Sequence, residues 1–404
     1  MNSQQALDMP LPALPRAFNM EFFKQNGNLW FAETTEVVSA STAKVTGFGE
    51  MIVLGGYSYL GLNGHPRINE AVMRAIERFG TGTTGARFLT GTISLHNELE
   101  REIAAFKEAD DAIVFTSGYM ANVATISTLA GENAVIISDQ LNHASIIDGC
   151  RYAKASRLRY AHNDLDDLER QLRAASGAAF RLVIVDSVFS MDGDIVDLPA
   201  VSELCRRHGA YLMVDEAHST GVLGATGRGI EEHFGLPSSA VDVKMGTLSK
   251  AIPANGGYIA GNRRLIDFLK SAARGFTYSG ALPPTSTAAA IAALQVIRDE
   301  PERVQRLQHN FTHFADMSRS LGLSVLGKGT PIVPILCGDA EMACRLALYC
   351  ADHGVFVHAV TSPVVAEGAA RLRCSVTAAH TIEELDRCAQ TIARGARELG
   401  LLQH

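Results

Sequence analysis

Short apolar runs alternate with helical segments through the first two thirds of the chain, and this alternation restricts the fold more than any other feature. Four runs occupy residues 112–116, 134–138, 182–186 and 211–215, and each is followed by a turn. Nearly continuous apolar strands separated by helices are typical of a parallel sheet covered on both faces. The sequence therefore predicts an α/β fold, and the pattern continues to a returning strand at 258–260.

The character of the sequence changes after residue 285. A long helical stretch is predicted over 287–320. Beyond it, the runs IVPILC, VFVHAV and RLRCSVT alternate with two helical segments. A chain of 404 residues has room for two or three packed units. We predict an N-terminal segment over 1–57, a large domain over 58–290 and a small C-terminal α/β domain over 291–404.

Charge and cysteine content exclude several classes of protein. The net charge of −7 provides no basic footprint for nucleic acid. The 7 cysteines are odd in number and form no CxxC pair, so we expect neither a disulfide framework nor a metal site. Pro10, Pro12 and Pro15 predict an extended arm rather than a signal peptide. No apolar run approaches the ~18 residues of a membrane span. We expect a cytoplasmic protein.

Polar residues gather where the predicted strands end, which is where open parallel sheets bind ligands. They are Ser117, Gly118, Tyr119, Asn142, His143, Ser190, Asp215, His218, Thr247, Ser249 and Lys250.

Lys250 and Asp215 indicate which ligand these polar residues could bind. A lysine beside hydroxyl-bearing Thr247 and Ser249 suits a Schiff-base amine next to a phosphate. A buried carboxylate such as Asp215 needs a cationic partner, which a pyridinium N–H would supply. Ser117 opens a helix, and helix N-termini bind phosphate. Each feature alone also fits a surface lysine, a helix cap or an ordinary turn. Together they fit pyridoxal phosphate (PLP).

At this point the chain resembles the α-oxoamine synthases, which are PLP enzymes of fold type I, the aspartate aminotransferase fold. The likeness spans about residues 50 to 390. The motifs that carry it are SYLGL (58–62), GTGTTGARFLTGTISLHNELE (80–100), TSGYMAN (116–122), NHASIIDG (142–149), VFSMDGDIVDL (188–198), VDEAHSTGVLGATGRG (214–229), GTLSK (246–250), YSGALPP (278–284) and RLRCSVTAAHT (371–381). The resemblance implies a mostly parallel seven-stranded sheet in the large domain.

The resemblance also implies roles around the cofactor ring. Lys250 would form the Schiff base and later move protons at the substrate Cα. His143 would stack over the pyridine ring. Asp215 would pair with the ring N–H, and His218 and Ser190 would hydrogen-bond the ring hydroxyl.

Further roles concern the phosphate and the substrate. The backbone of Gly118 and Tyr119, which follow Ser117, would hold the phosphate together with Thr247. Ser279 would reach the phosphate of a neighbouring subunit in a homodimer with shared sites. Arg373 would bind the amino-acid carboxylate.

The sequence departs from the family at a substrate contact and near the phosphate. Tyr57 stands where many relatives have an asparagine that contacts substrate, so that contact does not carry over. Gly280 replaces a second hydroxyl residue beside Ser279, and residues 251–255 differ from the usual glycine-containing stretch.

The glycine content adds a further expectation. The chain has 36 glycines, against roughly 28 at an average share of about 7%. Gly118 falls at the phosphate turn, and Gly221, Gly224, Gly227 and Gly229 follow the Asp215–His218 pair. We interpret this surplus as backbone that approaches the cofactor closely.

The implied reaction joins an α-amino acid to an acyl-CoA or acyl carrier protein thioester and releases carbon dioxide and an α-amino ketone. The segments 84–100, 142–151 and 162–169 are most similar to bacterial serine palmitoyltransferase-like members, and Tyr57 is similar to a tyrosine of eukaryotic serine palmitoyltransferases. The alternatives are an 8-amino-7-oxononanoate synthase, a 2-amino-3-ketobutyrate CoA ligase or a natural-product or autoinducer synthase. A non-catalytic PLP-fold subunit, an aminotransferase and an aldolase also remain open.

Overall fold

A seven-stranded sheet forms the centre of the large domain. The computed structural model describes residue 29 and residues 32–402, so the predicted arm with Pro10, Pro12 and Pro15 lies outside the described residues. The strand order is β4-β10-β9-β8-β7-β5-β6, and only β10 runs antiparallel to its neighbours. The predicted mostly parallel sheet is therefore confirmed. Its strands are β4 (Asp111–Phe115), β5 (Ala134–Asp139), β6 (Ser156–Tyr160), β7 (Phe180–Asp186), β8 (Tyr211–Asp215), β9 (Val243–Thr247) and β10 (Gly257–Gly261).

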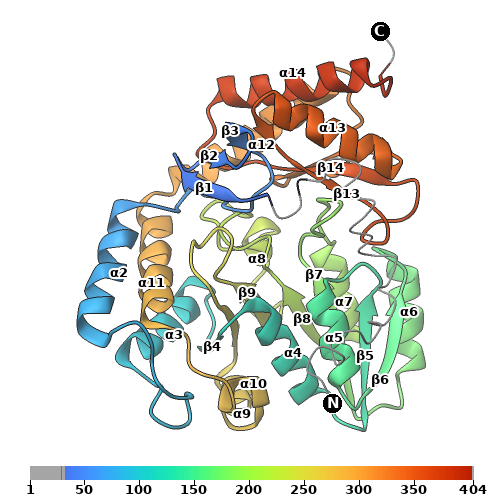
Figure 1. Ribbon diagram of the computed structural model, residues 1–404. Coiled ribbons are helices and arrows are strands. Elements are labelled where there is room, and N and C mark those ends of the chain that lie inside the picture. The colour runs from blue at the N-terminus through green and yellow to red at the C-terminus, as the bar shows by residue number, and fades with distance from the viewer. Residues whose placement is uncertain (1–28, 30–31, 403–404) are drawn as a thin grey trace, which may run out of the picture.

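Helices cover both faces of this sheet (Figure 1). The helices of this part of the chain are α2 (Pro66–Phe79), α3 (Ser94–Phe106), α4 (Gly118–Leu129), α5 (Ala144–Tyr152), α6 (Leu165–Ala174), α7 (Leu198–Arg207), α8 (Ile230–His233), α9 (Arg263–Ala272), α10 (Arg274–Thr277) and α11 (Pro284–Asp299).

Alternate residues of each central strand enter two different cores. In β7, Val183 and Val185 pack into the core on one face, while Leu182 and Ile184 pack into the core on the other. All four side chains are fully buried. This two-sided burial explains why the strands read as continuous apolar runs rather than as alternating ones.

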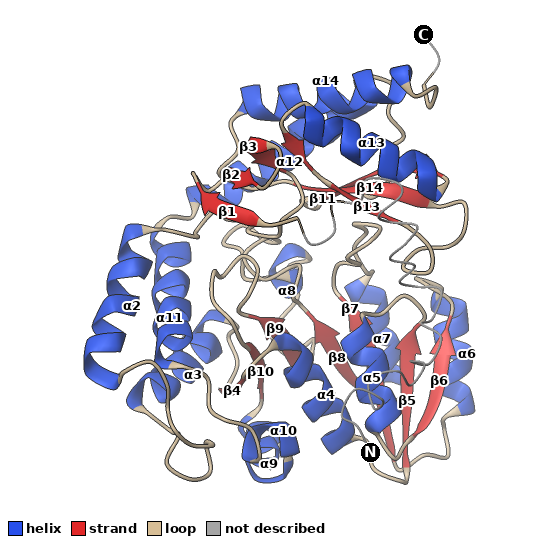
Figure 2. Ribbon diagram, in the orientation of Figure 1, coloured by secondary structure: helices blue, strands red, loops and turns tan. Residues whose placement is uncertain are grey.

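The C-terminal unit lies against the carboxyl ends of the parallel strands (Figure 2). It contains an antiparallel sheet of order β11-β14-β13, covered by helices. Its elements are α12 (Glu302–Ser320), β11 (Ile332–Gly338), α13 (Ala340–Asp352), β12 (Val355–Phe356), β13 (His358–Val360), β14 (Ala370–Ser375) and α14 (Ile382–Glu398).

The N-terminal strands belong to a third sheet that includes part of the C-terminal unit. This sheet has the order β1-β2-β3-β12, with β1 (Thr34–Val37), β2 (Thr42–Val45) and β3 (Gly49–Val53). Strand β12 pairs in parallel with β3, Val355 opposite Ile52. The described part of the 1–57 segment therefore attaches to the C-terminal unit. Within the described residues, no helix is both long and apolar enough to cross a bilayer.

Central-strand packing can be tested by cavity formation. Ile184→Ala removes a side chain that is 0% exposed in β7. We expect the free energy of unfolding of the cofactor-free protein to fall by about 2–5 kcal/mol, because the cavity cannot fully collapse. Chemical denaturation followed by circular dichroism measures the loss. Val37→Ala, at an edge position that is 57% exposed, is the control and should change stability by less than about 0.5 kcal/mol.

Candidate active site

A pocket opens at the carboxyl ends of the central strands, between the turns that follow β4, β5, β7, β8 and β9. Ten of the eleven polar residues predicted from the strand ends line it, all except Asn142. They are Ser117, Gly118, Tyr119, His143, Ser190, Asp215, His218, Thr247, Ser249 and Lys250. The topology of the sheet thus brings together residues spread over more than a hundred positions.

Lys250 lies in the turn after β9, with its amine buried in the pocket. Its Nζ is 2.7 Å from Nε2 of His218. Burial lowers the pKa of Lys250 to about 8, and the charge of Arg373 acts in the same direction, while Asp215 opposes both. Since only an uncharged amine is nucleophilic, this environment prepares Lys250 for reaction with an aldehyde near neutral pH.

His218 connects Lys250 to a residue that the sequence analysis missed. Its Nδ1 lies 2.7 Å from the hydroxyl of Tyr59, which is fully buried. Burial, together with the positive charge of Lys250, holds the pKa of His218 well below its usual range. The imidazole is therefore neutral and can accept a hydrogen bond on one side. Tyr59 belongs to the SYLGL motif at 58–62, and its place in that motif could have identified it as a site residue.

Asp215 ends β8 with both carboxylate oxygens engaged. Its Oδ2 accepts a 2.7 Å hydrogen bond from Nδ2 of Asn122, and its Oδ1 accepts one of 2.9 Å from the backbone of Ala217. Asn122 comes from α4, and the same Nδ2 is 2.9 Å from Oγ of Ser145 in α5. Asn122 was also missed from sequence, although it belongs to the TSGYMAN motif. These bonds fix the carboxylate for a cationic partner.

His143 caps the N-terminus of α5. Its backbone N–H donates to Oδ2 of Asp186 at 2.8 Å, and its Nδ1 lies 2.7 Å from Oγ of Ser145. Burial lowers the pKa of His143, so a neutral ring faces the pocket. Burial also raises the pKa of Asp186 well above its usual range, and the nearby charge of Asp215 adds to this effect. The hydrogen bonds to Asp186 and Ser145 hold His143 at the pocket wall.

The turn between β4 and α4 forms a cradle of backbone and hydroxyl groups. Ser117 caps α4, and Oγ1 of Thr247 lies 2.8 Å from Oγ of Ser249. A Cβ on Gly118 would lie 2.9 Å from Oγ1 of Thr247, and one on Gly257 would lie 2.6 Å from Cα of Gly118. Only glycine permits this approach of β10 and β9 to the helix N-terminus. Free helix N–H groups beside two hydroxyls suit a phosphate.

The donor set as a whole fits PLP. The phosphate cradle, the carboxylate of Asp215, the amine of Lys250 and the flat ring of His143 line the same pocket. Asn122 contributes a buried carbonyl oxygen, Oδ1, that has no hydrogen-bond partner.

The remaining predicted residues lie at or beyond the margin of the pocket. Arg373 in β14 donates from Nε to the carbonyl of Ser190 at 2.7 Å, and it is close enough to Lys250 to affect the pKa of that amine. Tyr57 is 50% exposed and does not line the pocket. Ser279 is partly buried and also lies outside the lining.

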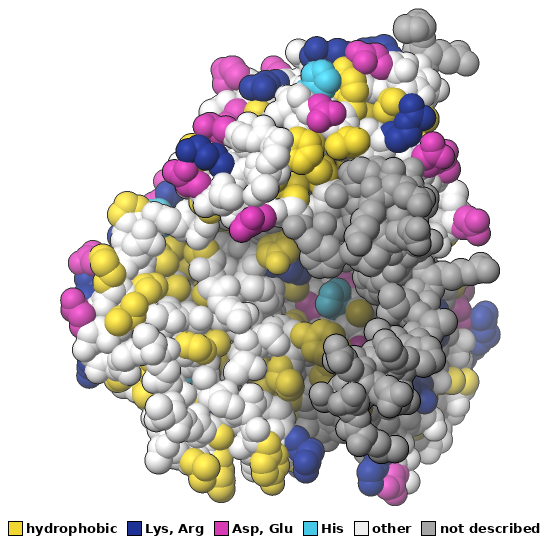
Figure 3. Space-filling view, viewed as in Figure 1, with side chains coloured by type: hydrophobic (Ala, Val, Ile, Leu, Met, Phe, Trp, Pro, Cys, Tyr) yellow, Lys and Arg dark blue, Asp and Glu magenta, His cyan; other side chains and the backbone are white. Residues whose placement is uncertain are grey.

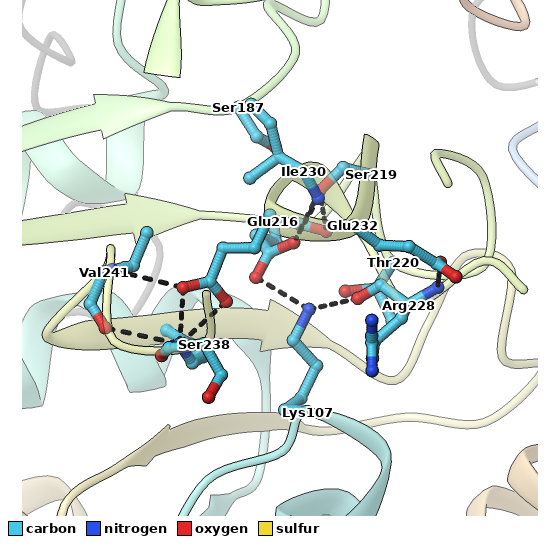
Figure 4. Close-up of polar contacts among 12 residues, drawn as sticks. Lys107, Ser187, Glu216, Ser219, Thr220, Arg228, Ile230, Glu232, Ser238 and Val241 are labelled. Atoms are coloured by element: carbon cyan, nitrogen blue, oxygen red, sulfur yellow. Dashed lines mark hydrogen bonds and ion pairs between the residues drawn. The ribbon is translucent and has the colours of Figure 1, made fainter. Parts of the chain in front are cut away.

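The glycine-rich loop after β8 packs against two carboxylates, and Figure 4 shows Glu216 and Glu232 bonded to the backbone of Ile230 and Arg228. Gly229 has φ +121°, and a Cβ there would lie 2.0 Å from Oε2 of Glu216. Gly224 has φ +85°, and its Cβ would lie 2.1 Å from Oε2 of Glu232. For Gly224 and Gly229, the interpretation as cofactor-approaching backbone is therefore wrong.

Glu216 itself is a fully buried anchor for this loop. It pairs with Nζ of Lys107 at 2.8 Å and accepts hydrogen bonds from the backbone of Ile230 and from Oγ of Ser219 (Figure 4). Lys107 also donates to the carbonyl of Arg228. Because Glu216 directly follows Asp215, the anchor fixes the loop that also carries His218.

Substitution of Gly229 tests this packing. Gly229→Ala should reduce both PLP content and thermal stability, since alanine is strained at positive φ and its Cβ would displace Glu216 from Lys107. Absorbance of the bound cofactor and thermal unfolding measure the two effects. Gly177→Ala, where a Cβ would meet nothing within 4 Å, is the matched control. Equal behaviour of the two variants would contradict a loop packed around Glu216.

Several known proteins are similar to this chain in sequence or in fold. The profile of the family "aminotransferase class I and II" matches residues 49–392. An 8-amino-7-oxononanoate synthase 1 of Bacillus velezensis is 44% identical over 95% of this chain and 98% of its own length. An 8-amino-7-oxononanoate synthase of Symbiobacterium thermophilum is 46% identical over 87% of this chain and 90% of its own length. A serine palmitoyltransferase solved with its PLP internal aldimine superposes with a TM-score of 0.92 at 32% identity, over 95% of this chain and 98% of that one.

Proposed function

This chain belongs to the α-oxoamine synthases of the aminotransferase class I and II family, and we propose on that basis that it joins alanine to a pimeloyl thioester. It is a PLP-dependent acyltransferase. In the proposed reaction, alanine loses its Cα proton, and a bond forms between that Cα and the thioester carbonyl carbon. The thiol of CoA or of a carrier protein leaves, the alanine carboxylate departs as carbon dioxide, and a proton returns to Cα.

The names of the relatives support alanine and a pimeloyl group over serine and a palmitoyl group. The product 8-amino-7-oxononanoate carries its amine and ketone on adjacent carbons, with a methyl group beyond the amine. Alanine supplies the amine-bearing carbon and the methyl group, and pimelate supplies the rest of the chain. The synthases of Bacillus velezensis and Symbiobacterium thermophilum are 44% and 46% identical to this chain, compared with 32% for the serine palmitoyltransferase. Among the activities that the sequence suggests, 8-amino-7-oxononanoate synthesis is therefore better supported than serine palmitoyltransferase chemistry.

The chain's own residues would bind and orient the reactants. When bound, PLP supplies an electron sink for the negative charge that develops at the amino-acid Cα. Asp215 would keep the proton on the ring nitrogen, because an adjacent carboxylate stabilises the cationic form. His143 would orient the ring from one face, and His218 with Ser190 would hydrogen-bond its hydroxyl. The cradle of Gly118 and Thr247 would hold the phosphate.

Two cationic side chains would act on the amino acid itself. Arg373 would bind the substrate carboxylate, because a planar guanidinium matches a carboxylate with two parallel hydrogen bonds. Lys250 would remove and return the proton at Cα. An amine with a pKa near 8 can both accept and donate a proton near neutral pH.

We also propose that two copies of the chain form a cytoplasmic homodimer. Hydrophobic side chains are spread over the visible face of the large domain (Figure 3). Phe88, Leu89 and Tyr278 are each at least 75% exposed. Ser279 adjoins Tyr278 but does not line the pocket of its own subunit. If a neighbouring subunit covers these side chains, Ser279 of this chain would reach the phosphate in the neighbouring subunit's pocket.

A matrix of substrates tests the proposed reaction. Purified protein loaded with PLP is incubated with alanine, serine or glycine and with pimeloyl, acetyl or palmitoyl thioesters, and products are identified by mass spectrometry. We expect 8-amino-7-oxononanoate from alanine with pimeloyl thioester, and carbon dioxide only when both substrates are present. The Lys250→Ala variant should form no product.

Other results of this experiment would favour other reactions. Product from serine with palmitoyl thioester alone would favour serine palmitoyltransferase chemistry, which the TM-score of 0.92 also makes the second candidate. Amino-group exchange without carbon dioxide release would point to an aminotransferase instead.

A further inference from the structure

The loop of residues 189–194, which follows β7, stands between the cofactor pocket and the small domain. It closes on itself through hydrogen bonds from the backbone N–H of Phe189 to the carbonyl of Asp194, at 3.0 Å, and from Gly193 to the carbonyl of Phe189, at 2.8 Å. Ser190 in this loop lines the pocket, and its carbonyl accepts the 2.7 Å hydrogen bond from Nε of Arg373. The loop therefore determines where one edge of that guanidinium is held.

His162 binds this loop from the large domain. Its Nε2 is 2.9 Å from Oδ2 of Asp194, and its Nδ1 is 3.1 Å from Oδ1 of Asp139 at the end of β5. The ring of Phe189 packs edge-on against the imidazole, with centroids 4.3 Å apart. Asn163 links the same two carboxylates as His162. Its backbone N–H donates to Asp139 at 3.1 Å, and its Nδ2 donates to Asp194 at 2.7 Å.

The charges at this bridge favour a doubly protonated histidine. Burial by itself would lower the pKa of His162, but hydrogen bonds to Asp139 and Asp194 and the charges of both carboxylates raise it to about 10. Both ring nitrogens then carry protons at neutral pH and donate to a carboxylate on each side. A neutral imidazole has one N–H and could serve only one of the two.

The small domain holds the same loop from the opposite side. Nη1 of Arg371 donates to Oδ1 of Asp192 at 2.6 Å and to the carbonyl of Met191 at 3.0 Å. Oγ1 of Thr330 donates to the carbonyl of Gly193 at 2.9 Å. A Cβ on Gly193, which has φ +71°, would lie 2.3 Å from the carbonyl oxygen of Ile332. These contacts hold the loop against the C-terminal unit.

The other end of the bridge reaches a second catalytic turn. Oδ1 of Asp139 accepts a 2.8 Å hydrogen bond from the backbone of Leu141, in the turn that leads to His143. His162 thus joins the turn that positions His143 to the loop that positions Ser190 and Arg373. Neither His162 nor Asp194 lines the pocket.

We propose that His162, clamped between Asp139 and Asp194, is a positioning residue that sets the orientation of Arg373 toward the carboxylate of the amino-acid substrate. This inference rests on the carboxylate-binding role proposed for Arg373. It assigns a purpose to the HND sequence at 162–164 and to the second aspartate of the SMDGD sequence at 190–194. Loss of the clamp should affect binding of the amino acid more than binding of the cofactor or the thioester.

The test uses His162→Gln in the PLP-loaded protein. Glutamine cannot donate in two opposite directions, so the bridge to one carboxylate is lost. Titration with alanine, followed by the change in cofactor absorbance, should show a dissociation constant raised by about tenfold to a hundredfold. The KM for alanine should rise in parallel, while the KM for the thioester and the PLP content change by less than about twofold. Asp194→Asn, which keeps the shape and removes the charge, should act in the same direction.

Matched variants separate the possible outcomes. His313→Gln removes a comparable contact, 2.7 Å to Asp386 between α12 and α14, and should leave alanine binding unchanged. Arg373→Gln must weaken alanine binding, and if it does not, the role proposed for Arg373 fails. If Arg373→Gln weakens binding while folded His162→Gln and Asp194→Asn do not, the positioning role of His162 is overturned and the proposed function stands. If His162→Gln does not fold, Asp194→Asn decides alone by the same criteria.

Discussion

Burial of the Lys250 amine beside His218 is the interaction on which the rest of the site depends. An amine exposed to water would stay protonated and unreactive, whereas desolvation lowers the pKa of Lys250 to about 8. In the same buried environment, a neighbouring charge is energetically unfavourable unless it is paired or hydrogen-bonded. Asp215 meets this requirement through Asn122 and the backbone of Ala217. His218 meets it by remaining neutral between Tyr59 and Lys250.

Buried carboxylates organise the loops that form the pocket. Glu216, Asp139 and Asp194 lie outside the pocket lining, whereas Asp186 is part of it. Glu216 anchors the loop carrying His218, Asp186 holds the backbone of His143, and Asp194 with Asp139 clamps the loop carrying Ser190. Each accepts backbone or side-chain N–H groups from a loop that has no regular secondary structure. Such loops pair only some of their own polar groups, so a buried acceptor takes the place of part of the missing ladder of hydrogen bonds. Rigid loops then hold the reacting groups at the end of a rigid sheet.

The sequence predicted those parts of the fold and site whose signals are local. The two-sided burial of β7 and β8 produces continuous apolar runs, and the strand-end motifs fall on the pocket as expected. Strand β6 was not predicted, because Ser156–Tyr160 lies at the sheet edge and carries two exposed arginines. The helical stretch 287–320 divides into α11 and α12 at Glu300 and Pro301, and VFVHAV divides between two sheets because β12 pairs with β3.

Partners distant in sequence could not be predicted in this way. Nothing local indicates that Tyr59 meets His218, that Gly229 packs on Glu216, or that His162 reaches Asp194. The measurement that tests the account most directly is the location of the cofactor after borohydride reduction of the PLP-loaded protein. Peptide mapping should place the label on Lys250, with a rate of attachment that is half-maximal near pH 8, as its lowered pKa requires. A label on the buried, paired Lys107 or Lys244, or a colourless protein with no label, would contradict the account.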